Sequence, residues 1–150
     1  MKEITIENAM KVDRPKMGGD IPVGLFRLVR LVAFEEILGE GAAGLAFQAG
    51  ERLGKSLGIK DLKGLAKACE DLKIGDVKIS ERSDNKIHVD VYECVTCSGM
   101  EPVGRPICHF EGGLIAGAIN TILNKKVKVK EVTCIGGLGD ETCGFDIDVL

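Results

Sequence analysis

The sequence predicts an α+β fold in which helices pack on a twisted antiparallel sheet of two β-hairpins. Three observations predict it. Apolar residues recur at helical spacing in four segments, they alternate strictly in the segments that follow residue 76, and short turn-rich stretches separate those alternating segments. The 150 residues, 45% of them hydrophobic, suffice for one core, so we expect a single main domain.

The N-terminal 20 residues are polar apart from a short alternation that includes Ile4 and Ile6. This pattern predicts an N-terminal arm or strand over residues 1–20, and residues 21–150 are expected to form the domain itself. From Pro22 to about Leu38, apolar residues cover most of a helix circumference. Such a distribution predicts a largely buried helix.

Two more helices are expected before the first strand. One runs from about Ala42 to Leu57 and is ended by Gly58. The next begins after Asp61, a residue that caps helix N-termini well, and ends near Gly75. Cys69 lies on the apolar stripe of this helix and is expected to be ordinary core.

The second half of the chain predicts two hairpins with a helix between them. Residues 77–80 and 87–92 alternate around a Ser-Asp-Asn turn, which predicts a hairpin with one solvated face. Pro106 suits the first turn of a helix that runs to about Leu123. Residues 127–130 and 143–149 then alternate around a glycine-rich turn, which predicts the second hairpin.

Composition disfavours several classes of function. The net charge of −3, with no Trp, one Tyr and five Phe, argues against direct binding of nucleic acid. The polar N-terminus lacks the apolar core of a signal peptide, and charged residues interrupt every apolar stretch, so we expect no membrane span and a cytoplasmic location. In that reducing compartment, six cysteines favour free thiols or metal ligands over disulfides.

Three cysteines and a glutamate in the last third form the strongest candidate site. Thiolates and a carboxylate together can complete a tetrahedral Zn²⁺ shell, and Cys108 is expected near a helix N-terminus, where its thiolate is favoured. We therefore expect one zinc ion to staple the second hairpin to the last helix. Four protein ligands close the shell, which favours a structural role over catalysis. The proposed ligands are Cys108, Glu131, Cys134 and Cys143.

The spacing leaves alternatives open. Glu131 and Cys134 have opposite strand parity, so both can reach one ion only if the strand bends, bulges or ends between them. Separately buried thiols, with Glu131 on a solvated strand face, are equally compatible with the spacing. Glu111 lies three residues after Cys108 on the same helical face and is the rival carboxylate ligand.

A C-x-x-C pair, Cys94 and Cys97, is expected at the end of a hairpin strand. This pair is compatible with thiols at a pocket rim, with half of a metal site, or with a redox pair, although a redox pair usually starts a helix. His109 is adjacent to Cys108 and is expected to be a second-shell donor to the metal.

The motifs around these residues resemble the 4-vinyl-reductase domain family. The resemblance rests on ECVTCSG at 93–99, CHFEGGLIAG at 108–117, EVTC at 131–134 and GDETCGF at 139–145. It implies the fold of phenol-responsive sensory modules and of the small TRAPP trafficking subunits, a zinc held at the four residues above, an enclosed apolar pocket, and a homodimer. Those phenol-binding modules use a Trp and a His to hold the hydroxyl, and this chain has no Trp and no His before His88, so phenol itself is not the expected ligand.

The leading hypothesis is therefore a zinc-containing small-molecule-binding module for an apolar or aromatic ligand, which signals through its dimer contacts or a separate effector protein. The alternatives are a reductase or thiol-redox enzyme acting on a hydrophobic substrate such as a tetrapyrrole, and a trafficking-like scaffold without ligand. An enzyme is the less favoured of these, because no nucleotide-binding fingerprint is present. The expected pocket residues, each equally at home in an ordinary core, are Phe47, Ile87, Phe110 and Leu114.

Overall fold

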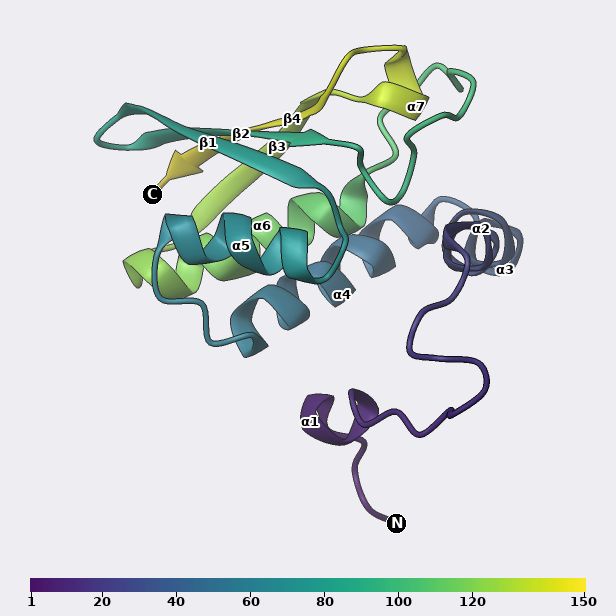
Figure 1. The fold of residues 1–150 in the computed structure, drawn as a ribbon. Coiled ribbons are helices and arrows are strands. Elements are labelled where there is room, and N and C mark those ends of the chain that lie inside the picture. Colours follow the sequence, from purple (N-terminus) through teal and green to yellow (C-terminus); the bar gives the residue numbers. More distant parts are fainter.

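A computed structural model describes residues 1–150 and confirms the α+β architecture (Figure 1). Its centre is a four-stranded antiparallel sheet with the strand order β1-β2-β4-β3. The two hairpins predicted from the sequence are present, and β2 and β4 join them. The strands are β1 (Asp76–Ser83), β2 (Lys86–Tyr92), β3 (Val127–Thr133) and β4 (Cys143–Val149).

One face of the sheet carries the core and the other is solvated. Val89, Phe145 and Ile147 are almost fully buried on the core face, as the alternation of their strands predicts. Lys128 and Lys130 alternate with half-buried valines on β3 and remain exposed. The lysines of β3 are thus a solvated strand face.

The helices lie in two layers beneath this sheet. Helices α5 (Leu62–Asp71) and α6 (His109–Leu123) cover its inner face, and α4 (Gly41–Ser56) crosses beneath α6 (Figure 1). Asp61 caps α5 as predicted, since its Oδ1 accepts a hydrogen bond of 2.6 Å from the amide of Gly64. Cys69 is buried on α5, as expected for a core residue. No helix combines the length and the hydropathy that crossing a membrane requires.

Glycines bring α4 and α6 into backbone contact. A Cβ at Gly113 or Gly117 of α6 would overlap the carbonyl oxygen of Phe47 or Glu51 of α4. The contact is reciprocal, because a Cβ at Gly50 of α4 would overlap the backbone of α6. This interlock fixes the position of α6, and with it the N-terminal end that carries Cys108.

The segment predicted as one buried helix is a continuous run of α2 (Val23–Arg27), the π-helical turn η1 (Leu28–Ala33) and α3 (Phe34–Leu38). The prediction of burial is wrong, since Arg30 is the only buried residue of the run. The run lies at one end of α4, and no second layer covers its outer side (Figure 1). Its apolar surface is therefore directed to solvent.

Residues 1–22 form an exposed arm rather than a strand. Their only regular element is the single turn α1 (Ile6–Ala9), and Figure 1 shows this arm projecting away from the domain. The alternation of Ile4 and Ile6 has no neighbouring strand to pair with in this fold. The arm therefore adds nothing to the core of the single chain.

We predict that Gly113→Ala destabilises the domain by about 1–3 kcal/mol or more, because the new methyl group must push α4 and α6 apart. Gly44→Ala is the matched control on α4. No atom lies within 4 Å of a Cβ at Gly44, so it should stabilise the helix by up to about 1 kcal/mol. Urea unfolding measures both changes. Equal effects of the two substitutions would contradict the interlock.

Candidate metal centre

Cys108 occupies the point where the last helix starts. It is the N-cap residue of α6, and its side chain is fully buried. Its amide donates to the two carboxylate oxygens of Glu131, at 3.3 Å and 3.1 Å. This contact brings the carboxylate of β3 to the start of α6, although 23 residues separate the two in the chain.

The strand β3 bends where its two ligands require it. Its register with β4 shifts between Glu131 and Thr133, so Val132 lies in an irregularity of the ladder. The shift removes the parity conflict between Glu131 and Cys134. Cys134 then caps the short helix α7 (Ile135–Leu138), and its amide donates to Asp140 at 2.8 Å. The glycine-rich turn is thus partly helical.

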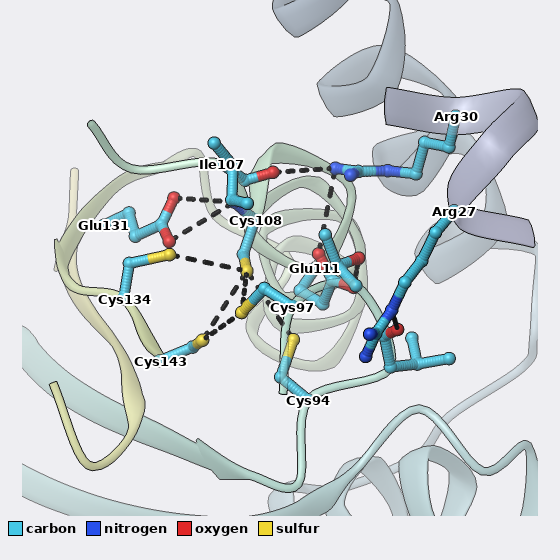
Figure 2. A network of polar contacts seen from close by, with 12 residues as sticks. Arg27, Arg30, Cys94, Cys97, Ile107, Cys108, Glu111, Glu131, Cys134 and Cys143 are labelled. Atoms are coloured by element: carbon cyan, nitrogen blue, oxygen red, sulfur yellow. Dashed lines mark hydrogen bonds and ion pairs between the residues drawn. The ribbon is translucent and has the colours of Figure 1, made fainter. Parts of the chain in front are cut away.

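The four residues singled out by the sequence lie together. One ligand atom from each of Cys108, Glu131, Cys134 and Cys143 lies within 4.8 Å of every other. The sulfur of Cys108 is 3.8 Å from that of Cys134 and 3.5 Å from that of Cys143 (Figure 2). A zinc ion with Zn–S bonds of about 2.3 Å would hold its sulfur ligands about 3.8 Å apart. The donor set and its spacing therefore fit a tetrahedral zinc ion.

Two further cysteines join this group, a position that the sequence left open among several. The sulfur of Cys97 lies 3.3 Å from those of Cys108 and Cys143, and the sulfur of Cys94 lies 3.5 Å from that of Cys108. None of these cysteines forms a disulfide. The C-x-x-C spacing was the only signal of their role, and the path of the loop from 98 to 107 decides where that pair lies.

Glu111 is not the carboxylate of the cluster. It is 1% exposed, and it accepts a hydrogen bond from Thr96. Its other oxygen lies 3.9 Å from Arg30, whose guanidinium also donates to the carbonyl of Ile107 at 3.2 Å. Burial raises the pKa of Glu111, while Arg30 opposes that rise. The rival ligand is therefore engaged on the far side of Cys108 (Figure 2).

Without a cation, the cluster retains protons. Burial, followed by a hydrogen bond with Cys134, raises the pKa of the Glu131 carboxyl to about 9. Hydrogen bonds with the surrounding thiols, that of Cys134 foremost, hold the pKa of Cys108 far above its ordinary value. Hydrogen bonds with Cys108 and Cys143 lower the pKa of Cys134 to about 6. A metal ion would replace the retained protons and remove the repulsion between the ligands.

His109 lies half-buried at the first position of α6 and belongs to neither group of close ligand atoms. Burial, followed by the positive charge of Arg30, lowers the pKa of His109. A neutral imidazole beside the cluster is compatible with the second-shell role predicted for it.

The four residues expected to line a ligand pocket have different surroundings. Ile87 and Leu114 are buried core residues, and Ile87 also borders a polar surface hollow of about 300 Å³. Phe47 is half-buried, and its ring lies near Gly112. Phe110 is half-buried between the ring of Phe26, at a centroid distance of 6.1 Å, and the guanidinium of Arg30.

Comparisons with known proteins agree with this architecture. The family model of the 4-vinyl-reductase domain matches residues 87–149. An uncharacterized protein of Methanocaldococcus jannaschii, MJ1642, is 34% identical over 135 residues, which cover 90% of this chain and 82% of the relative. The crystal structure of a vinyl-4-reductase family protein from M. jannaschii superposes with a TM-score of 0.71 at 25% identity, over 90% of this chain and 85% of that one.

Two more distant structures share the fold. The phenol-responsive sensory domain of the transcription activator PoxR, solved with phenol, has a TM-score of 0.64 at 15% identity, over 86% of this chain and 75% of that domain. A trafficking protein particle complex subunit 3 from Naegleria fowleri, covalently bound to palmitic acid, has a TM-score of 0.58 at 13% identity, over 85% of this chain and 95% of that subunit.

We predict that zinc affinity falls as the pH falls, by about tenfold per pH unit for each proton that the ion displaces. Below its pKa of about 9, Glu131 holds a proton in the metal-free protein and loses it to the ion. The slope of log affinity against pH, measured by chelator competition between about pH 6 and 8, should therefore be smaller by about one in Glu131→Gln. The exposed Glu101→Gln serves as the control, and equal slopes in all three proteins would count against Glu131 as a ligand.

Proposed function

The chain belongs to the 4-vinyl-reductase domain family, and on that premise we propose that it is a small-molecule-binding module whose zinc ion is structural. The observation that carries the proposal is the convergence of four buried or half-buried ligand atoms from α6, β3, α7 and β4 within 4.8 Å. Zn²⁺ would be held by Cys108, Glu131, Cys134 and Cys143. A shell of four protein ligands has no open position for a substrate.

The zinc would act as a staple between elements that share few other polar contacts. The second hairpin supplies three of its ligands, and the start of α6 supplies the fourth. A cytoplasmic location accords with this chemistry, because all six cysteines are free thiols. In a reducing compartment the metal, rather than a disulfide, provides the cross-link.

We place the ligand beside Phe110, beneath the run from Val23 to Leu38. Phe26 and Phe110 offer two aromatic faces, and Arg30 lies over the ring of Phe110 at 5.9 Å. Glu111 Oε2, Arg30 Nε and Ser98 Oγ are buried there without a hydrogen-bond partner. An apolar or aromatic molecule with one polar group suits such surroundings, and phenol and palmitic acid in the two distant structures are molecules of that kind.

The π-helical turn η1 is the element that would have to move for entry. A π-turn leaves a helix less regularly hydrogen-bonded, and such turns are frequent at functional sites. Displacement of this run by a ligand would reach the rest of the molecule through Arg27 and Arg30, whose guanidinium groups bind the 95–107 segment. A separate effector protein could then respond to the run or to the exposed arm.

A second copy of the chain is the proposed cover for the outer side of this run. A row of apolar side chains there is between about 46% and 59% exposed, far more than a core helix would show. A homodimer would bury this row and leave the inner side to the ligand. The residues of the row are Val23, Leu25, Leu28, Val29 and Val32.

We predict that the Leu28→Glu/Val32→Glu double variant is monomeric in sedimentation velocity, whereas the wild type is a dimer. The charges would oppose burial of the row, and both side chains are exposed in the single chain, so the fold should survive. Leu72→Glu, another exposed leucine, is the control and should remain dimeric. A monomeric wild type at tens of micromolar would contradict the dimer.

We predict that natively purified protein carries one apolar molecule, detectable by native mass spectrometry, or that added palmitic acid or phenol raises its melting temperature. Binding at about 100 times the dissociation constant stabilises a protein by about 2.7 kcal/mol. Phe110→Ala should lose the effect, and Tyr92→Ala, an exposed aromatic on β2, should keep it. A bare protein that neither probe stabilises would favour the scaffold alternative.

The zinc assignment has its own test. Metal analysis of the wild type should find zinc, and Cys134→Ser should weaken its retention against a chelator by at least about tenfold, because a hydroxyl replaces a thiolate ligand. Cys69→Ala, a buried cysteine of α5, should leave zinc retention unchanged. Equal retention in Cys134→Ser and in the wild type would overturn the assignment.

A further inference from the structure

We propose that the cysteine cluster binds two divalent metal ions, with the sulfur atoms of Cys108 and Cys143 bridging them. The second ion would be a thiophilic cation such as Zn²⁺, held by four thiolates. This inference rests on the zinc site proposed above, because the two sites share two ligands. The new ligand set is Cys94, Cys97, Cys108 and Cys143.

The arrangement of the ligand atoms carries the inference. Each of the two sets has all four of its ligand atoms within 4.8 Å of one another, and the sets have two members in common. The shared sulfur atoms, those of Cys108 and Cys143, are 3.5 Å apart. Figure 2 shows Glu131 and Cys134 on one side of Cys108 and Cys94 on the other. Two coordination tetrahedra that share one edge would have this arrangement.

The sulfur distances suit the second ion as well as the first. Cys97 lies 3.3 Å from both bridging sulfurs, and Cys94 lies 3.5 Å from that of Cys108. A regular zinc–thiolate tetrahedron has edges of about 3.8 Å, so binding needs shifts of only a few tenths of an ångström. An ion at the Glu131 side would leave Cys94 and Cys97 as two unused thiols packed against its ligands.

The charge of the cluster also favours a second ion. One divalent ion with three thiolates and a carboxylate has a formal charge of −2. Adding a second divalent ion together with two more thiolates leaves that charge unchanged. Ionising Cys94 and Cys97 beside the first site without an added cation would instead place two further negative charges in a buried space.

The turn that carries the new ligands is built rather than incidental. The amides of Cys97 and Ser98 both donate to the carbonyl of Cys94, at 3.2 Å and 3.0 Å. Gly136 of α7 packs so closely on this turn that a Cβ there would lie 2.6 Å from the carbonyl oxygen of Cys97. Arg27 binds the carbonyls of Val95 and Ser98 at 2.8 Å and 2.9 Å. The two thiols are therefore held in place by three separate elements.

The second ion would connect the cluster to the proposed ligand site. The 94–98 turn holds Arg27 of α2 through two carbonyls, and its Thr96 binds Glu111 beside Arg30. Fixing Cys94 and Cys97 to a metal would fix both contacts. The first ion staples the hairpin to α6, and the second would staple the start of the molecule to the same centre.

Metal stoichiometry tests the inference. Protein purified under reducing conditions, loaded with Zn²⁺ and passed over a desalting column, should hold two zinc ions per chain by native mass spectrometry. Two reciprocal double variants, Cys94→Ser/Cys97→Ser and Glu131→Gln/Cys134→Ser, should each hold one, because each keeps one complete ligand set. Cys108→Ser removes a bridge and should retain neither ion tightly, whereas Cys69→Ala should hold two.

The outcomes separate this inference from the proposed function. One zinc in the wild type that survives Cys94→Ser/Cys97→Ser would overturn the second site and leave the first in place. One zinc that survives only Glu131→Gln/Cys134→Ser would overturn both assignments, and so would a wild type that binds none. The ¹¹³Cd spectrum of the unaltered protein is independent of any variant. Two resonances, one from an all-sulfur site and one from a site with oxygen, support the bridged pair, and a single resonance contradicts it.

Discussion

Five cysteine sulfurs and the Glu131 carboxylate meet in a space that nearly excludes water, and this convergence constrains everything around it. Groups that become negative when ionised repel one another strongly in such a space, so the bare cluster keeps protons on Cys108 and Glu131. A divalent cation reverses that preference, because it attracts every ligand at once. The loops that supply these ligands have little hydrophobic burial of their own, so the metal is the natural source of their order.

The glycine interlock gives this centre a rigid base. Gly50 and Gly113 let α4 and α6 approach to backbone contact, and Cys108 caps the helix that this contact fixes. The ligands then arrive from the ends of β2, β3 and β4, where strands stop and the backbone is free to turn. Opposite the metal, Arg27 and Arg30 tie the N-terminal run to the same loops. A ligand, a dimer partner and the metal therefore act on one connected set of contacts.

The sequence predicted much of this from local patterns. Alternation located the four strands, Asp61 marked the start of α5, and the parity conflict between Glu131 and Cys134 implied the irregularity found at Val132. Long-range arrangement was harder. Nothing local places the Cys94 turn against Cys143, because the loop after it can run in several directions. The burial predicted for the run from Val23 to Leu38 failed because an apolar helix can also be covered by something outside its own chain.

Amide hydrogen exchange before and after chelation tests the central claim, that metal coordination orders these loops. The account predicts that metal removal speeds exchange by at least about tenfold at Cys134 and in the 94–98 turn, while amides of α6 beyond the glycine contacts stay protected. Unchanged exchange of the loops in the chelated protein, with the metal shown to be gone, would contradict it.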